Sequence, residues 1–279
     1  MEVLLSCMNQ TDFSLVDKCR IRTDAVIINQ HTNNSYAEIT VDGKKITMFS
    51  STQRGLSRSR NYALSQATGD ICLLCDDDVT YVDNYETIVI EAFQTLPQAD
   101  IIVFNTNLVN AFEPRNPIVK IRKAPRYKLY GSVRMAFRLD SIRRANVWFN
   151  TNFGAGSKYS AGEESLWLLE LRKKGLQVYE YPATICAVDY SESTWFTGRN
   201  EKYYYDKGAF LAAGYPRLKG ILKYYLAFRL GNATDLGKRD ILRWIKNGMK
   251  GYEASLSFEE YTASYFQQTP PLRVDRSEV

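Results

Sequence analysis

The sequence predicts an α/β fold in which a mostly parallel sheet, flanked by helices, is followed by a C-terminal helical extension. Short apolar runs of strand length alternate with helix signals through the first half of the chain. These runs are continuously apolar, which indicates strands buried on both faces, as in parallel sheets. In the last third the composition changes to basic and aromatic segments. With 45% hydrophobic and 24% charged residues among 279, the composition excludes disorder for the bulk of the chain.

The first half of the chain alternates strands and helices. In chain order we expect a strand over residues 3–6, a short helix over 13–19, a strand over 25–29, a helix over 55–67, a strand over 71–74, a helix over 85–96 and a strand over 101–105. Pro97 ends the third helix. Alternating β-branched residues on either side of Asp42-Gly43 predict a hairpin over residues 36–50.

The second half is less regular. Residues 107–130, rich in Pro, Asn, Arg and Lys, predict a long loop or lid. After it we expect a strand over 132–139, a loop over 149–160, a helix over 162–174 ended by Gly175, a strand over 178–181 ended by Pro182, and basic-aromatic helices at 222–230 and 241–252. We therefore divide the chain into an α/β domain over residues 1–195, a basic amphipathic helical extension over 196–256 and a flexible tail over 257–279.

Composition also excludes several classes of protein. No apolar run approaches the roughly 18 residues that span a bilayer, and the start lacks the basic leader of a secretory signal. Five scattered cysteines fit a reducing compartment, so we expect a cytoplasmic protein. The only histidine is His31, which excludes zinc sites built on several imidazoles. Acid–base chemistry must therefore rest mainly on carboxylates.

An acidic run, Asp76-Asp77-Asp78, directly follows the apolar strand over 71–74 and Cys75. In open α/β sheets, ligands bind outside the carboxyl ends of the strands. On an extended backbone Asp76 and Asp78 point to one side and Asp77 to the other, so the first two repel each other unless a cation lies between them. Carboxylate ligands favour Mg²⁺ or Mn²⁺ over zinc. The alternative is a solvated acidic turn before the next helix.

Arginines gather at the start of the helix over 55–67, at Arg54, Arg58 and Arg60. The dipole already makes a helix N-terminus positive, so cations there are best tolerated beside an anion. Free backbone N–H groups at such a terminus also bind phosphate oxygens. A diphosphate that bridges these arginines and a metal on the acidic run would explain both features; a solvated basic face is the alternative.

A third motif, Ser160-Ala161-Gly162-Glu163-Glu164, opens the helix over 162–174. Ser160 followed three residues later by Glu163 predicts a capping box, in which Glu163 accepts from the Ser160 N–H. Glu164 is then the spare carboxylate, and the helix N-terminus is expected to keep it ionised at neutral pH, as a general base requires. The alternative is a glutamate that only favours the helix dipole.

In this order the three motifs resemble those of the family 2 glycosyltransferases, which have the GT-A fold, a Rossmann-like nucleotide-binding sheet. Ser59-Arg60-Asn61 looks like the A-R-N of that family, and Leu74-Cys75-Asp76-Asp77-Asp78-Val79 like its L-D-D-D-V version of the D-x-D motif. Gly162-Glu163-Glu164 is similar to its G-E-D, with Glu in place of the final Asp. The match runs from about Val3 to Tyr190.

The resemblance implies a metal-dependent, inverting glycosyltransferase of the bacterial surface-polysaccharide type. It implies a nucleotide-diphosphate sugar donor, with UDP favoured, a glycan or lipid-linked saccharide acceptor, and Mn²⁺ or Mg²⁺ as the cofactor. The catalytic candidates are Glu164, as the base that takes the acceptor proton, and Glu163. The donor-binding candidates are Asn29, Gln30, Arg54, Ser57, Arg58, Arg60, Asp76 and Asp77.

The metal candidates are Asp76, Asp78 and Asp189. Many members of the family have a metal-binding histidine where this chain reads Ala187-Val188-Asp189-Tyr190. Asp189 is the replacement we consider there, and a missing third ligand is the alternative.

Two basic-aromatic segments follow the matched region, over residues 217–229 and 238–250. Basic amphipathic helices with Trp and Tyr suit an anionic membrane surface, which would place the protein at the inner face of the membrane. Helices that pack on the catalytic domain with solvated basic edges are the alternative.

Three other functions compete with the glycosyltransferase. A catalytically degenerate relative would bind nucleotide or glycan as a membrane-docked partner. We do not expect a nucleic-acid binder, because the acidic run would repel phosphates unless it held a metal. A sugar nucleotidylyltransferase would need a glycine-rich loop near the N-terminus, and none is present.

Overall fold

The computed structural model describes residues 1–110, 116–189, 198–230, 234 and 236–268. The chain forms two compact units, which we describe separately. The first comprises Met1–Ser157 and Gly162–Phe196, and the second Lys158–Ala161 and Thr197–Val279. The sequence-based limits at 1–195, 196–256 and 257–279 stay predictions.

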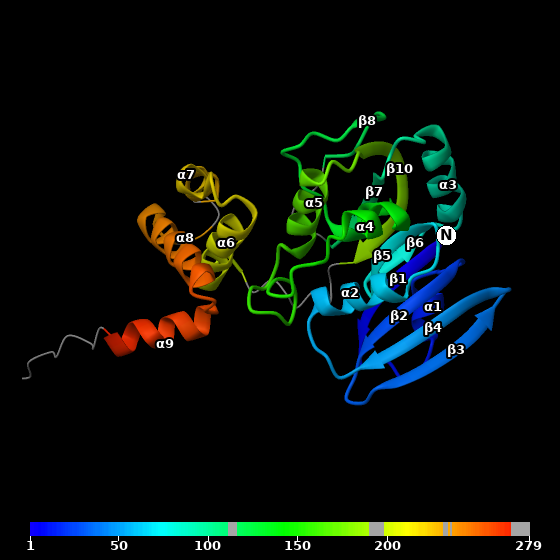
Figure 1. Cartoon of the computed structure of the whole chain (residues 1–279), viewed down its shortest axis with the longest axis horizontal. Helices are drawn as coiled ribbons and strands as arrows, with labels where there is room; N and C mark the ends of the chain where they lie inside the picture. Colours follow the sequence, from blue (N-terminus) through cyan, green and yellow to red (C-terminus); the bar gives the residue numbers. More distant parts are fainter. Residues whose placement is uncertain (111–115, 190–197, 231–233, 235, 269–279) are drawn as a thin grey trace, which may run out of the picture. The chain divides into compact units, whose positions relative to one another are not determined.

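The described part of the first unit holds a ten-stranded sheet with the strand order β3-β4-β2-β1-β5-β9-β7-β10-β6, and β8 pairs with β10 (Figure 1). The strands are β1 (Glu2–Met8), β2 (Asp24–Gln30), β3 (Ser35–Val41), β4 (Lys44–Ser51), β5 (Ile71–Asp76), β6 (Val79–Tyr81), β7 (Ile101–Val109), β8 (Arg122–Lys123), β9 (Met135–Arg138) and β10 (Val178–Asp189). Strands β4, β2, β1 and β5 run parallel to one another, and β7 is parallel to β10. Because β9 runs antiparallel to both β5 and β7, all six of these strands end at the same edge of the sheet.

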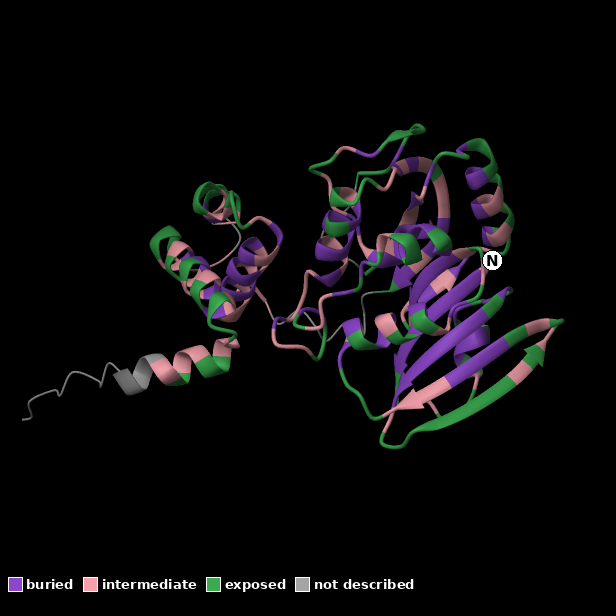
Figure 2. Ribbon diagram, viewed as in Figure 1, coloured by how far each residue is buried: buried purple, intermediate pink, exposed green. Residues whose placement is uncertain are grey.

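Helices cover both faces of this sheet, as predicted. They are α1 (Ser14–Lys18), α2 (Leu56–Gln66), α3 (Tyr85–Thr95), α4 (Leu139–Ala145) and α5 (Glu163–Lys173), with a 3₁₀ turn at Ser132–Arg134. Val3 and Leu5 of β1 join the core that includes α1 and α3, whereas Leu4 joins the core that includes α2, α4 and α5. Figure 2 shows the central strands buried and β3 exposed. Continuous apolar runs are therefore required, since both faces of each central strand are covered.

Two elements differ from the sequence prediction. Strand β10 does not end before Pro182 but continues to Asp189, with its register to β7 shifted between Glu180 and Thr184. A proline without an N–H is tolerated at such an irregularity, because no ladder hydrogen bond is required there. The strand predicted over 132–139 is divided into the 3₁₀ turn, the short β9 and the beginning of α4.

Part of the segment predicted as a long loop is pinned by a buried carboxylate, Glu180 of β10. Glu180 is fully buried and accepts hydrogen bonds from Arg122, from Lys128 at 2.5 Å and from the Tyr130 hydroxyl at 2.8 Å. Burial raises the pKa of Glu180, but these three donors outweigh it and lower the pKa to about 2. The carboxylate therefore stays charged and holds residues 122–130 to the sheet.

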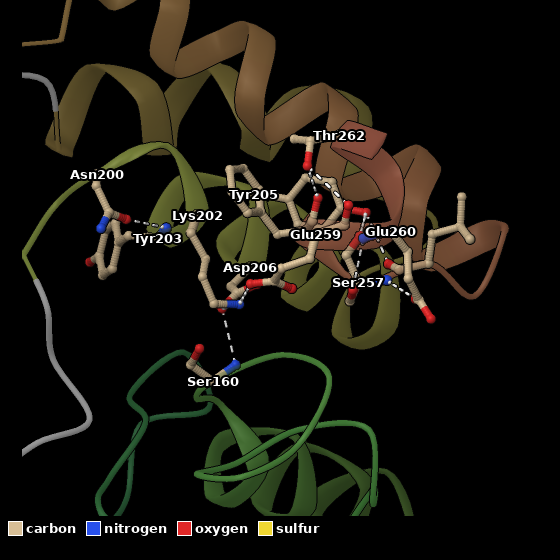
Figure 3. A network of polar contacts seen from close by, with 12 residues as sticks. Ser160, Asn200, Lys202, Tyr203, Tyr205, Asp206, Ser257, Glu259, Glu260 and Thr262 are labelled. Atoms are coloured by element: carbon tan, nitrogen blue, oxygen red, sulfur yellow. Dashed lines mark hydrogen bonds and ion pairs between the residues drawn. The ribbon is translucent and has the colours of Figure 1, made fainter. Parts of the chain in front are cut away.

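The second unit contains the four helices α6 (Glu201–Gly214), α7 (Lys219–Leu230), α8 (Lys238–Glu253) and α9 (Phe258–Gln268) in its described residues. Its core includes Tyr204, Leu211 and Ile245. Within the segment predicted as a tail, α9 begins with a capping box that Figure 3 shows. The Ser257 N–H donates to Glu260 at 2.6 Å, and the Glu260 N–H donates to the Ser257 hydroxyl at 3.1 Å. Residues 269–279 of the expected tail lie outside the described residues.

Candidate active site

The candidate site lies where the carboxyl ends of the parallel strands meet the start of α2 and α5. Asp76 is the last residue of β5, and β1, which pairs with β5, brings Ser6 opposite it. Helix α2 carries Arg60, and helix α5 begins at Glu163. Sheet topology therefore brings together motifs that are far apart in the chain.

Arg60 is the centre of the site. Its side chain is 2% exposed, and Nη2 contacts both carboxylate oxygens of Asp76, at 3.0 and 2.9 Å. Nη1 donates to Glu163 at 3.0 Å, and Nη2 also reaches the Ser132 hydroxyl at 2.8 Å. Burial lowers the pKa of Arg60, but the charges of Asp76, Glu163 and Glu164 raise it above its ordinary value. Arg60 is thus a permanent cation that joins the acidic run to the helix with the glutamates.

The predicted capping box at Ser160 does not form. Gly162 is the N-cap of α5, with φ of 112° and no side-chain hydrogen bond. The Ser160 N–H donates to Asp206 instead, at 3.0 Å (Figure 3). Glu163 does not reach back to Ser160, because its carboxylate is paired with the buried Arg60 guanidinium, and a charge-assisted hydrogen bond of this kind is stronger than a cap.

Glu164 lies half-buried beside this pair. Burial, followed by the charge of Glu163 and a hydrogen bond with it, raises the pKa of Glu164 to about 8, against the opposing charge of Arg60. The expectation that the helix N-terminus keeps Glu164 ionised at neutral pH is therefore wrong for this arrangement. A carboxyl with a pKa near neutrality can still serve as a general base, because such a pKa balances basicity against availability.

The other two aspartates of the run occupy the turn between β5 and β6. Asp77 is exposed and Asp78 half-buried, and the Asp78 carbonyl accepts from the Asp189 N–H at 3.1 Å. Burial, and then the charges of Asp76 and Asp77, raise the pKa of Asp78 to about 6. The Asp189 carboxylate is exposed and accepts from Asn110 at 3.0 Å. Negative charge is thus concentrated at this turn beyond what Arg60 neutralises.

Within the described residues, no three His, Cys, Asp or Glu side chains come together as a ready-made metal site. Mg²⁺ commonly takes one or two carboxylates and completes its shell with water and substrate phosphates. The charges of Asp76 and Asp77 raise the pKa of Asp78, with Lys18 opposing them, and this concentration of negative charge fits a divalent cation held in that way. Asp76 and Asp78 could hold it, and the role of Asp189 as a further ligand stays a prediction.

The predicted base-binding pair, Asn29 and Gln30 at the end of β2, is engaged within the protein. Asn29 is fully buried and donates to the Gln10 carbonyl at 2.8 Å and to Ser50 at 3.1 Å. Gln30 accepts from the Gly55 N–H at 2.7 Å, directly before α2. Both side chains therefore position the loops around the site, whatever else they contact.

The predicted diphosphate-binding set separates into buried and exposed members. Ser57 is fully buried and donates to the Phe153 carbonyl at 2.7 Å. Arg54 and Arg58 are exposed; Arg54 donates to the Gln30 carbonyl at 2.8 Å and Arg58 to the Arg54 carbonyl at 3.2 Å. An anion can therefore reach the exposed guanidiniums of Arg54 and Arg58, whereas the Ser57 hydroxyl and the Arg60 guanidinium are buried.

Three further residues complete the surroundings of Arg60 and were missed in the sequence. Ser132 accepts from its guanidinium, the Phe149 ring lies 5.7 Å from its Cζ, and Asn61 exchanges hydrogen bonds of 2.9 and 2.8 Å with the Phe149 backbone. Asn61 stood within the Ser59-Arg60-Asn61 motif, so a signal existed for it. No local sequence pattern predicts that Ser132 or Phe149 lies beside Arg60.

A pocket of about 830 Å³ opens beside α2 in the first unit. It is lined by Asn34, Ser35, Tyr36, Phe49, Ser50, Ser51, Gln53, Arg58, Asn61, Tyr62 and Thr151. Arg58 is the one predicted donor residue in this lining, and the acidic run and Glu164 are outside it. The pocket borders the carboxyl end of β4, at Ser50 and Ser51.

No helix among the described residues is long and apolar enough to cross a membrane.

The sequence profile described as glycosyl transferase family 2 matches residues 4–163. A comparison with curated proteins gives no match.

Similar solved structures include S. aureus TarS 1–349 in complex with UDP, with a TM-score of 0.56, 12% identity and coverage of 92% of either chain. The same TarS fragment described without a ligand gives 0.54 at 11% identity, covering 92% of this chain and 93% of that one. Its complex with UDP-GlcNAc gives 0.51 at 14% identity, covering 98% and 77%. At sequence identities this low, the structural similarity shows that the fold is shared and shows nothing further.

Proposed function

The chain belongs to glycosyl transferase family 2 and is a glycosyltransferase with the GT-A fold, and we propose that it moves a sugar from a nucleotide-diphosphate donor to an acceptor hydroxyl. The observation that carries the proposal is the buried Arg60, which joins Asp76 to Glu163 at the carboxyl edge of the sheet. This one contact brings the acidic run and the Gly162-Glu163-Glu164 motif to a single place, where a donor and an acceptor can meet.

The exposed guanidiniums of Arg54 and Arg58 support a diphosphate at this edge, since paired arginines bind phosphate oxygens well. A divalent cation, Mn²⁺ or Mg²⁺, would be held by Asp76 and Asp78 and would stabilise the negative charge of the departing diphosphate. UDP is the favoured nucleotide, because the TarS structures similar to this fold contain UDP and UDP-GlcNAc.

Glu164 is the proposed base of an inverting single displacement. Its carboxylate takes the proton of the acceptor hydroxyl as that oxygen attacks the anomeric carbon, while the bond between this carbon and the diphosphate oxygen breaks. Glu163 is a positioning residue, because its carboxylate is occupied by Arg60 and lies next to Glu164. The proposed acceptor is a glycan or lipid-linked saccharide in polysaccharide biosynthesis.

Two variants test this assignment. Asp78→Ala is expected to abolish turnover of UDP-sugar in the presence of Mn²⁺, because the cation loses one of the two carboxylates proposed to hold it. Glu164→Gln is expected to bind UDP with unchanged affinity and to lose transfer by about 10² to 10⁴ fold, the usual contribution of a general base. Calorimetry measures the binding, and release of UDP measures the turnover.

Asp83→Ala is the matched control for the first variant, because its side chain is 91% exposed and it follows the acidic run without belonging to it. Transfer by Asp78→Ala at the parent rate would exclude a metal at this aspartate. Transfer by Glu164→Gln at the parent rate would move the base to another group.

A degenerate nucleotide-binding partner is the second candidate. Arg60 contacts both carboxylate oxygens of Asp76, which leaves them less available to a catalytic metal and so favours this candidate. Binding of UDP with Mn²⁺ but no hydrolysis or transfer across a panel of UDP-sugars and saccharide acceptors would support this candidate over the enzyme.

A further inference from the structure

Helix α7 exposes an unusual amount of apolar surface. Ala227 is its one buried residue among those described. The large apolar side chains of its outer surface are exposed to 73% at Ile221, 55% at Tyr224, 58% at Tyr225 and 71% at Phe228, and Leu218, directly before the helix, is exposed to 53%. We call this set the α7 face. Soluble proteins seldom leave such side chains together in water unless the surface binds something.

The side chains of the α7 face share one side of the helix. Leu218, Ile221, Tyr225 and Phe228 follow one another at intervals of three and four residues, which places them in a continuous stripe. The remaining apolar residues of the helix, such as Leu222 and Leu226, pack against the core of the second unit. The exposed stripe is therefore additional to the packing surface.

Cations surround this stripe, and residues 216–230 contain no acidic side chain. The Lys223 ammonium lies 5.0 Å from the centre of the Tyr224 ring, and that of Lys238 lies 5.2 Å from the centre of the Phe228 ring. Arg217 and Arg229 are exposed at the two ends. An apolar and aromatic stripe with basic edges is the pattern of a helix that lies in a lipid interface.

Helix α8 looks similar in sequence but differs in the structure. Its residues Ile241 and Ile245 are fully buried, and the Trp244 indole N–H donates to Glu201 of α6 at 3.0 Å. Its apolar side thus belongs to the core of the second unit, and its exposed side chains are charged, as at Lys246, Lys250 and Glu253. Of the two basic-aromatic helices in the sequence, α7 alone presents an open apolar face among the described residues.

We infer that the α7 face docks on an anionic lipid bilayer. A second copy of the chain on the same face would bring the basic edges of both copies against each other, which opposes that occupant. Anionic headgroups neutralise the same cations, and the rings of Tyr224, Tyr225 and Phe228 enter the boundary between headgroups and acyl chains. This docking is independent of the proposed transfer reaction and is measured without donor or acceptor.

Flotation of the full chain with vesicles tests the inference. The parent protein is expected to bind phosphatidylcholine vesicles that contain about 30% phosphatidylglycerol and to bind pure phosphatidylcholine much more weakly. Ile221→Ser with Phe228→Ser removes two exposed side chains and is expected to reduce the partition coefficient at least about tenfold. Arg217→Gln with Arg229→Gln is expected to reduce it about fivefold for each charge removed.

Matched controls distinguish binding through the α7 face from non-specific binding through other exposed apolar or basic side chains. Val119→Ser with Tyr127→Ser removes side chains exposed to 79% and 85% in the first unit, and Lys246→Gln with Lys250→Gln removes two exposed charges from α8. Both pairs are expected to change binding less than about twofold, because none of their side chains belongs to the α7 face. Circular dichroism and thermal melting check that every variant is folded.

Binding by Ile221→Ser with Phe228→Ser at the parent level would overturn the inference. It would also be overturned if the control pairs lost as much binding as the α7 variants. A parent dimer that this double variant dissociates, with no binding to anionic vesicles, would assign the α7 face to a second copy instead.

Discussion

A buried guanidinium is costly to desolvate, and Arg60 is stable in its position because two carboxylates surround it. Asp76 and Glu163 approach it from different elements, and the side chain of Glu163 is only 6% exposed. Removing one partner of such a cluster leaves the others buried and uncompensated. Arg60 therefore stabilises the fold and also decides which carboxyl of the neighbouring pair is free.

Arg60→Met is expected to lower the free energy of unfolding of the chain by about 3 kcal/mol or more, because Glu163 would lose its buried counter-charge. Urea unfolding followed by circular dichroism measures the change. Arg58→Met, at an exposed position of the same helix, is the control and should stay within about 0.5 kcal/mol of the parent. Equal stability of parent and Arg60→Met would show that the ion-pair cluster contributes little.

The raised pKa of Glu164 predicts a particular pH dependence. The base form is the deprotonated one, and the pKa lies at about 8, so the transfer rate should rise with pH up to about 8 and then level off. Below that value kcat/KM for transfer should fall about tenfold per pH unit. A profile that is flat from about pH 6 to about pH 9 would contradict a base with this pKa.

The same pattern, Ser-x-x-Glu, begins two helices and has different outcomes. At α9, Ser257 and Glu260 form the reciprocal capping box, and the cap lowers the pKa of Glu260. At α5, Glu163 turns to Arg60 and the pattern caps nothing. A local pattern forms its local hydrogen bonds when no buried charge competes for the side chain.

Helices α6 and α8 pack closely because glycines lie at their contact. A Cβ added at Gly248 would lie 1.8 Å from the Tyr205 carbonyl oxygen, and one added at Gly208 would lie 2.1 Å from the Ile245 carbonyl oxygen. Both obstacles are backbone atoms, which cannot turn aside as a side chain can. The contact between these helices therefore depends on the absence of side chains.

Gly248→Ala is expected to destabilise the second unit by about 1–3 kcal/mol or more, because the overpacked backbone must separate, although alanine favours helix by about 1 kcal/mol. Thermal unfolding measures it. Gly220→Ala in α7 is the control, since a Cβ there meets nothing within 4 Å, and it should be neutral or stabilising. A stabilised Gly248→Ala protein would show that α6 and α8 are not in close contact.

In the molecule as a whole, the parallel strands end at one edge of the sheet, and the candidate site residues lie at that edge. Asp76 ends β5, Asn29 and Gln30 end β2, and α2 and α5 begin nearby. This is the expected place for a ligand in an open α/β sheet. The second unit contributes separate helices, one of which presents the α7 face.

UDP with Mn²⁺ is expected to raise the melting temperature of the whole chain, because a ligand that binds only the folded state stabilises it. At a concentration about 100 times the dissociation constant, the rise should be about 5–10 °C. Asp78→Ala should lose the part of the shift that depends on Mn²⁺. An equal shift in the parent with and without Mn²⁺ would show that the nucleotide binds independently of the metal.

The α/β fold, most of its strands, and the family were predictable from the sequence. Strands at 71–74 and 25–29 are continuous apolar runs, and this information is local, so it can be read along the chain. Each of the three motifs is also a run of consecutive residues, so it can be recognised along the chain. Strand β10 beyond Pro182 and helix α4 were missed, because their limits depend on neighbouring strands rather than on their own residues.

The partners of each motif residue could not be predicted in the same way. Arg60 and Glu163 are 103 residues apart, and no local pattern shows that one will take the other away from its cap or raise the pKa of Glu164. Likewise, α7 and α8 are both basic and aromatic, and the closer packing of α8 against α6 is what buries its apolar side while that of α7 stays open. Periodicity fixes which faces are apolar, whereas burial and the pairing of charges depend on which segments meet in space.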